Sequence, residues 1–285
     1  MKTVLITGAN GFIGSALMRA FAANGWRAIG AGRSQPPELP EGAEWRAYDL
    51  AWTTLPDEFF DGVDAIVHGA MMKRTAGDRS FDINVAAGKL LLDRAQQRGI
   101  DRVAFLSSLA AHDGALSDYG KHKYVLERHF DRRNALVIRP GLVIGNGGLF
   151  ASMADYLRSH RFVPLIGGGK QPLQTIYIDD LTAIVAEAIE GNLRGTLTAA
   201  EREPVTYRRF YEELGEGIGV KPIFVRVPFW AVEGCLTTAT LLHLKLPVDR
   251  DNLLGLKSMQ ADEGLRYASL PVRAYGAAIA KALNR

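Results

Sequence analysis

The chain has a single cysteine, Cys235, among its 285 residues. One thiol excludes a disulfide framework within the chain, which fits a reducing compartment such as the cytoplasm. It is also too isolated to indicate a metal site. We therefore predict a cytoplasmic protein whose fold depends on neither a disulfide nor a metal ion.

A strong net charge is also absent, because 34 basic residues face 31 acidic ones and the formal charge is +3. Nucleic-acid-binding proteins more often carry a basic stripe, and none stands out here. Long apolar runs are scarce as well. The N-terminal run ends at Gly8, which predicts a strand and not a signal peptide.

One segment, residues 228–246, has enough apolar side chains to suggest contact with a membrane. Glu233 and Lys245 interrupt it, and Pro228 and Pro247 bracket it. A spanning helix needs about 20 mostly apolar residues. The sequence favours a buried or lid-like helix, with membrane contact through this segment as the alternative.

A glycine-rich turn follows the first apolar run, in the sequence Thr7-Gly-Ala-Asn-Gly-Phe-Ile-Gly14. Residues 3–7 read as a buried strand and residues 13–24 as a helix. Glycines between a strand and a helix N-terminus let the backbone approach a pyrophosphate, which the free N–H groups and the helix dipole then bind. The pattern predicts dinucleotide contacts at Gly8, Asn10, Gly11, Phe12, Ile13 and Gly14.

Short strand-like runs alternate with helical runs through the first half of the chain. Such alternation predicts right-handed βαβ crossovers and a doubly wound parallel sheet of the Rossmann type, with helices on both faces. The predicted strands are 3–7, 27–31, 44–48, 65–68, 103–107 and 136–139. The predicted helices of this half are 13–24, 81–98 and 119–133.

After about residue 145 the pattern becomes less regular. We therefore expect a dinucleotide-binding domain over residues 1–145, with a strand near 175–190 returning to its sheet. Residues 146–285 would form a smaller, mainly substrate-binding lobe, with helices at 149–159, 207–215 and 228–242.

Tyr119 and Lys123 lie four residues apart on a predicted helix, so they share a face. Ser107 and Ser108 come at the end of the preceding strand. A Tyr-x-x-x-Lys pair alone occurs on many helices by chance. Behind a dinucleotide-binding turn, and with serines at the neighbouring strand end, it becomes a candidate for proton transfer.

Taken together, these motifs resemble an extended or atypical short-chain dehydrogenase/reductase of the NAD-dependent epimerase/dehydratase type. The resemblance runs from the glycine turn to residues 176–180, about two-thirds of the chain. Its other motifs, in order, are Asp49-Leu50, Val67-His68-Gly69-Ala70, Asn84, Ser107-Ser108, Tyr119 to Lys123 and Arg139-Pro140-Gly141.

The resemblance implies that Tyr119 exchanges a proton with a substrate hydroxyl or carbonyl. Tyrosine has an ordinary pKa of about 10, so a nearby Lys123 charge would favour the phenolate. Lys123 would also bond the nicotinamide ribose. Ser108 would hydrogen-bond the reacting oxygen, with Ser107 as the less favoured alternative.

Other positions take cofactor roles on the same grounds. Asp49 would contact the adenine, Asn84 would support the helix of Tyr119 and Lys123, and Pro140-Gly141 would lie near the carboxamide. The remaining implied contacts are Leu50, His68, Gly69, Ala70 and Ser107. His68 receives no part in proton transfer, and His122 is expected to be structural. Helices 81–98 and 119–133 commonly pair in a homodimer in this family.

The end of the second strand bears on the choice of cofactor. NAD-binding proteins usually place an acid there to bond the ribose hydroxyls. This chain has Ala31-Gly32-Arg33-Ser34 and no acid. Arg33, assisted by Ser34, could pair with a 2′-phosphate, so the sequence favours NADP over NAD.

The sequence departs from the nucleotide-sugar epimerases at two places. Leu142 stands where they tend to carry asparagine, and residues 171–175 lack their arginine. We therefore expect an NAD(P)-dependent oxidoreductase that acts on a carbonyl or secondary alcohol, including a sugar-derived one. Met71, Met72 and Lys73 would border its pocket. The alternatives are a nucleotide-sugar epimerase or 4-reductase, and a non-catalytic accessory or redox-sensing protein that binds NAD(P). Residues 164–171 resemble atypical members related to a respiratory complex I accessory subunit.

Overall fold

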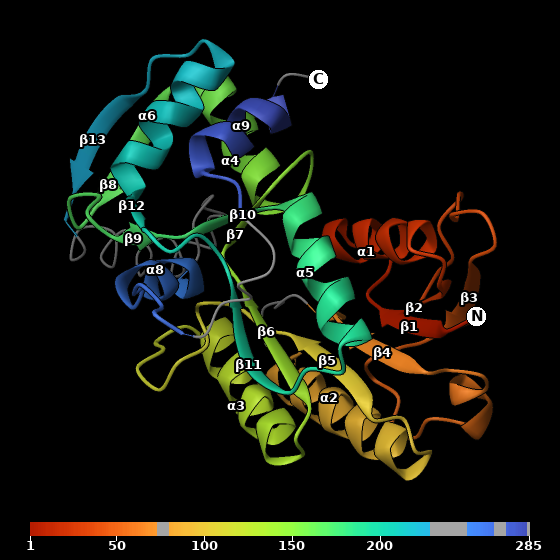
Figure 1. Cartoon of the computed structure of the whole chain (residues 1–285). Helices are drawn as coiled ribbons and strands as arrows, with labels where there is room; N and C mark the ends of the chain where they lie inside the picture. The colour runs from red at the N-terminus through yellow and green to blue at the C-terminus, as the bar shows by residue number, and fades with distance from the viewer. Residues whose placement is uncertain (73–79, 229–249, 265–271, 284–285) are drawn as a thin grey trace.

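The computed structural model of the protein describes residues 1–72, 80–228, 250–264 and 272–283 (Figure 1). Its centre is a seven-stranded sheet in the order β11-β6-β5-β4-β1-β2-β3, in which every neighbouring pair is parallel. The strands are β1 (Thr3–Thr7), β2 (Arg27–Gly32), β3 (Glu44–Ala47), β4 (Ala65–His68), β5 (Arg102–Leu106), β6 (Leu136–Pro140) and β11 (Gly195–Ala199). The predicted doubly wound α/β fold is confirmed.

Helices cover both faces of this sheet, as Figure 1 shows. On one face lie α1 (Phe12–Ala23) and α5 (Ile178–Glu190), and on the other lie α2 (Ser80–Gln97) and α3 (Asp118–Arg132). Alternate strand residues face opposite helices. In β1, for example, Ile6 packs in the cluster of α1 and α5, and Leu5 packs in the cluster of α2 and α3.

The direction of winding of the sheet reverses at β1. From β1 the chain builds outward on one side through β2 and β3, and on the other side through β4, β5 and β6. In parallel sheets, ligands bind where this reversal occurs. The glycine turn and the ends of β4 and β5 therefore lie at this position.

A smaller set of elements follows β6 and has its own apolar cluster. Its helices are α4 (Gly148–His160), α6 (Tyr207–Ile218) and α9 (Tyr275–Leu283), while α8 (Arg250–Lys257) packs against α3. Three two-stranded sheets join them: β7 (Leu142–Ile144) with β10 (Thr175–Tyr177), β9 (Pro172–Leu173) with β12 (Val205–Thr206), and β8 (Phe162–Ile166) with β13 (Ile223–Val227).

The return strand differs from its prediction. Residues 175–177 do form a strand, β10, but it pairs with β7 outside the main sheet, and residues 178–190 form α5. The strand that joins the main sheet is β11, beside β6. The apolar residues of 178–190 recur at helical spacing and bury one face against α1, so that segment could not serve as a strand. The predicted helix 228–242 lies mostly outside the described residues.

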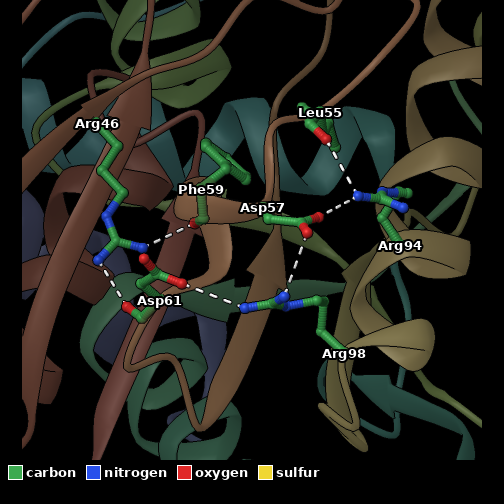
Figure 2. Close-up of polar contacts among 7 residues, drawn as sticks. All are labelled: Arg46, Leu55, Asp57, Phe59, Asp61, Arg94 and Arg98. Atoms are coloured by element: carbon green, nitrogen blue, oxygen red, sulfur yellow. Dashed lines mark hydrogen bonds and ion pairs between the residues drawn. The ribbon is translucent and has the colours of Figure 1, made fainter.

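A polar brace fixes the segment after β3 (Figure 2). Arg94 of α2 and Arg98, the residue directly after α2, pair with Asp57 of the 3-10 helix η1 (Asp57–Phe60), and Arg98 also reaches Asp61 at 3.2 Å. From β3, Arg46 donates to the carbonyls of Phe59 and Asp61 at 2.7 and 2.8 Å. The brace holds the chain that follows Asp49-Leu50 against the sheet edge.

Candidate active site

The glycine turn is tightly packed against the sheet. Gly8 has φ +75°, in the left-handed region that favours glycine, and a Cβ there would lie 2.8 Å from the backbone nitrogen of Ala70. A Cβ on Gly14 would lie 2.2 Å from the carbonyl oxygen of Gly8. Both positions therefore require glycine, for conformation and close approach.

The helix that follows this turn has an open N-terminus. Gly11 is its N-cap, no side chain caps it, and the first turn holds no acid. Among the described residues, nothing bonds the amides of Phe12, Ile13 or Gly14. Three unpartnered N–H groups at the positive end of a helix dipole suit an anion such as pyrophosphate.

Thr7 ties the turn to the neighbouring strand. Its Oγ1 accepts from the amides of Gly69 and Ala70, each at 3.2 Å, and lies 2.8 Å from His68 Nδ1. Burial, and secondarily the charge of Lys123, lower the pKa of His68 to about 3. His68 is therefore neutral, consistent with the absence of a proton-transfer role. No separate role was predicted for Thr7, although its place directly before Gly8 was a usable signal.

At the end of β2 the structure presents a cation and no acid. Arg33 and Ser34 are exposed, and Asn10 Nδ2 donates to the Ser34 carbonyl at 2.5 Å. Within the described part of the chain the Arg33 side chain has no ion pair. Asp49 instead closes a local turn, because its Oδ1 accepts from the Ala51 amide at 2.9 Å. Leu50 packs against the apolar cluster under α2.

Ser108 and Tyr119 come together at the C-terminal end of β5, where the Ser108 hydroxyl hydrogen-bonds the Tyr119 phenol. Ser108 Oγ also accepts from the Ala110 amide at 3.2 Å. Ser107 differs: its Oγ is buried and unpartnered among the described residues, while its amide donates to the Ile138 carbonyl at 2.7 Å. Of the two serines, Ser108 is the one beside Tyr119.

The pKa of Tyr119 moves opposite to the expected direction. Burial raises it, and the hydrogen bond from Ser108 only partly offsets this. Lys123 Nζ lies 6.0 Å from the centroid of the Tyr119 ring and donates at 2.6 Å to the carbonyl of Leu106. Its charge is therefore directed to the backbone, and the phenol is neutral at pH 7.

Lys123 itself is buried, with 5% of its surface exposed and Nζ 4.7 Å from the Phe105 ring. Burial lowers its pKa to about 8, although the carboxylate of Glu127 acts in the opposite direction. Glu127 is paired with Arg139 through two hydrogen bonds of 2.9 and 2.6 Å. This pair was not foreseen, although Glu127 lies four residues after Lys123 on one helix face.

The N-terminus of α3 is fully capped, unlike that of α1. Ser117 Oγ accepts from the Gly120 amide at 3.1 Å. The carboxylate of Asp251 in α8 accepts from the amides of Asp118 and Tyr119, the latter at 3.3 Å. Residues more than 130 positions apart thus fix the helix that carries Tyr119. No signal in the sequence around Asp251 indicated this contact.

Asn84 has a different contact from the expected one. Its side chain accepts from the Met72 amide at 2.8 Å and donates to the Met72 carbonyl at 3.0 Å. It therefore holds the segment after β4, because its position on α2 faces that segment and not α3. Lys73, expected beside Met71 and Met72 at the pocket, lies outside the described residues.

Gly141, Pro140 and His122 complete the expected set. The Gly141 amide donates to the Ala199 carbonyl at 3.0 Å, and the Pro140 carbonyl accepts from Leu109 at 3.3 Å. Burial lowers the pKa of His122 to about 4, and its Nδ1 lies 3.1 Å from the Asp118 carbonyl. His122 is thus a neutral packing residue beside Tyr119.

Two expectations concern residues that the structure does not describe. Cys235 and nearly all of segment 228–246 fall there. Across the ranges that the structure does describe, no helix is long and apolar enough to cross a membrane. The same ranges contain no group of three or more His, Cys, Asp or Glu side chains suited to a metal ion.

Comparison with known proteins assigns the chain to one family. Residues 4–196 match the model of the NAD dependent epimerase/dehydratase family. The chain is 28% identical over 252 residues to the ceramide reductase of Caulobacter vibrioides, covering 84% of this chain and 77% of that protein. It is 25% identical over 260 residues to the 2-alkyl-3-oxoalkanoate reductase of Stenotrophomonas maltophilia, covering 79% and 78%. Other relatives are longer, and the chain spans 30% of an uncharacterized Mycobacterium tuberculosis protein.

Solved structures share the fold across nearly the whole chain. A human epimerase family protein determined with NADPH has a TM-score of 0.70 and 22% identity, and covers 99% of each chain. At this identity the likeness concerns the fold alone.

Proposed function

The chain belongs to the NAD dependent epimerase/dehydratase family, and on that premise we propose that it reduces a ketone with a nicotinamide cofactor. It is an NAD(P)-dependent enzyme. One observation carries the direction of the reaction. Tyr119 is a neutral phenol whose hydroxyl meets that of Ser108, and a neutral phenol is the form that can donate a proton.

The residues present fit such a cofactor. The open amides of α1 and the glycine turn suit its pyrophosphate, and Arg33 lies where a 2′-phosphate would require a cation. The bound cofactor would then pass beside Gly69, Ala70, Pro140 and Gly141. When bound in reduced form, the nicotinamide supplies a hydride.

Three side chains perform the remaining chemistry in this proposal. Ser108 donates a hydrogen bond that orients the substrate carbonyl oxygen. Tyr119 donates its proton to that oxygen as it gains negative charge. Lys123, buried beside both, holds a positive charge that stabilises the phenolate left behind.

Residues of the C-terminal part would form most of the substrate pocket. Gln260 bonds His112 at 2.8 Å, and the Gln174 side chain bonds the backbone of Asp262 on both its amide and carbonyl. These contacts bring segment 258–264 to the ends of β5 and β10. We infer that this segment takes part in substrate selection.

A ketone on a lipid-like or small-molecule skeleton is the substrate class we favour, because two relatives are named as reductases of ceramide and of 2-alkyl-3-oxoalkanoate. A nucleotide-sugar 4-reductase is the second candidate. A Streptomyces bikiniensis relative, 26% identical over 255 residues, is named dTDP-4-dehydro-6-deoxy-D-allose reductase. Leu142 and residues 171–175 weigh against it, since they supply no obvious diphosphate partner.

The test is the reduction of a panel of 3-oxo fatty acyl compounds, ketosphingoid lipids and dTDP-4-keto sugars. The measured quantity is the rate of NADPH consumption. Tyr119→Phe should lower kcat by about a hundredfold or more on the active substrate while NADPH binding is retained. Tyr124→Phe, on the same helix, is the matched control and should leave turnover unchanged. Full turnover by Tyr119→Phe would exclude the proposed proton donor.

Cofactor preference has its own test. Arg33→Ala should raise the KM for NADPH about tenfold and leave the KM for NADH nearly unchanged, because only NADPH carries the 2′-phosphate. Arg19→Ala, an exposed arginine on α1, controls for the loss of one positive charge. Equal effects on both cofactors would contradict the NADP assignment.

A further inference from the structure

The small sheet of β8 and β13 has an outer face made only of apolar side chains. The two strands are parallel, and aligned partners in a parallel pair project to the same side. Three of the outer residues are exposed, Phe162 at 54%, Ile223 at 43% and Val225 at 45%, whereas Ile166 at the far end is buried, at 6%. The aligned pairs of this face are Phe162 with Ile223, Pro164 with Val225, and Ile166 with Val227. We refer to these six residues as the β8–β13 face.

The protein's own core does not account for this composition. The opposite side of the pair holds Val163, Leu165, Phe224 and Arg226. Val163 and Leu165, at 0% and 1% exposure, pack with Phe224 in the cluster of α4, α6 and α9, while Arg226 is exposed at the rim of this side. Strands with one buried and one solvated face normally alternate apolar with polar residues. An apolar outer side therefore indicates a surface that something else covers.

The charge around this face has one sign. Between Asp155 and Asp179 the sequence has three basic residues and no acid, and between Glu216 and Glu233 it has two and no acid. Arg161, Lys221 and Arg226 are exposed, and in the described residues no side chain pairs with them. The carbonyl of Arg161 accepts from the Ile223 amide at 2.7 Å, so the Arg161 backbone adjoins the first aligned pair of the face.

We propose that the β8–β13 face docks on an anionic lipid bilayer. Exposed apolar side chains enter the interface while flanking cations meet lipid headgroups, the combination that binds proteins to such surfaces. A second copy of the chain fits less well, because a twofold contact would set the same unpaired cations against one another. Figure 1 shows the pair at the edge of the C-terminal part, away from β1 to β3.

Vesicle sedimentation tests the proposal without any substrate or turnover, so its outcome is separate from that of the proposed reaction. The full chain should sediment with vesicles of phosphatidylglycerol and phosphatidylcholine, and not with phosphatidylcholine alone. Added salt should weaken the binding. Replacing Arg161, Lys221 and Arg226 together by Gln should weaken it about a hundredfold, because each cation near such a surface strengthens binding about fivefold.

A second variant tests the contribution of the apolar side chains separately from that of the cations. Phe162→Ser with Val225→Ser should also reduce sedimentation, and because both residues are exposed the fold should persist in circular dichroism. The matched control removes three other exposed arginines, Arg19, Arg128 and Arg132, by replacement with Gln, and should bind as the parent does.

Three outcomes would overturn the proposal. The parent could fail to sediment with anionic vesicles, or the control could lose binding as strongly as the Arg161, Lys221 and Arg226 variant. The third is a dimer in sedimentation velocity that the Phe162→Ser, Val225→Ser variant abolishes, which would assign the face to a second copy.

Discussion

Replacing Lys123 by methionine should stabilise the protein at neutral pH, although Lys123 belongs to the proposed active site. Lys123 is 5% exposed, and burial lowers the pKa of its ammonium from the ordinary 10.5 to about 8. Below about pH 8 the lysine is charged in both the folded and unfolded chain, so folding must bury a charge. Methionine has a similar shape and no charge to bury.

The size of the effect follows from linkage. Each pKa unit corresponds to about 1.4 kcal/mol, so the displacement from 10.5 to about 8 corresponds to about 3 kcal/mol of lost stability below pH 8. Between about pH 8 and 10.5 the folded chain releases the proton first, so the parent gains stability as pH rises. Loss of the hydrogen bond to the Leu106 carbonyl offsets part of the gain in the variant by a roughly pH-independent amount.

The decisive quantity is therefore the pH dependence of the difference between the two proteins. Urea unfolding at pH 6.5, 8 and 9.5 should show the advantage of Lys123→Met shrinking by about 2 kcal/mol across this range. Lys121→Met removes an exposed lysine of the same helix and should stay within about 0.5 kcal/mol of the parent throughout. A difference for Lys123→Met that does not change with pH would refute the reasoning.

Four further substitutions test three other parts of the site. Gly14→Ala would set a methyl group 2.2 Å from the Gly8 carbonyl oxygen, and should weaken NADPH binding in a fluorescence titration by about tenfold or more. Arg139→Met strands the Glu127 carboxylate, whose side chain is 4% exposed, and should lower the free energy of unfolding by about 3–5 kcal/mol in urea. Glu127→Gln should cost less, about 1–3 kcal/mol, because the guanidinium left behind is 22% exposed; the reverse order would contradict this. Asp251→Asn removes a charged cap from α3 and should lower the thermal midpoint by about 2–4 °C, and an unchanged midpoint would exclude a stabilising cap.

The sheet could be predicted from the sequence because its signals are local. The apolar runs of β1 and β4 coincide with the structure at both ends, and the helices of the first half differ by a residue or so. Each is a buried strand or amphipathic helix bounded by glycine or a polar turn. The C-terminal part offered weaker signals, since β7, β9 and β12 have two or three residues each and depend on pairing with distant chain.

The candidate site shows the same contrast between features that local sequence predicts and features that depend on distant contacts. Motif and spacing brought Ser108, Tyr119 and Lys123 to attention, and the structure has these residues around one strand end. The resemblance implied that Lys123 would favour the phenolate of Tyr119, whereas in the structure burial raises the pKa of Tyr119. The outcome depends on burial and on the Leu106 carbonyl that receives the ammonium, and neither can be read from a four-residue interval.

The same geometry explains why α3 responds to distant parts of the chain. Asp251 holds its first turn, Lys123 fastens its middle to β5, and Glu127 fastens the next turn to β6 through Arg139. Each contact comes from a different element, and each limits how far Tyr119 can move relative to Ser108. A phenol held this way in a buried position remains protonated until a substrate oxygen needs its proton. Ketone reduction uses the neutral phenol directly, whereas alcohol oxidation uses the phenolate, so burial of Tyr119 shifts oxidation to higher pH than reduction.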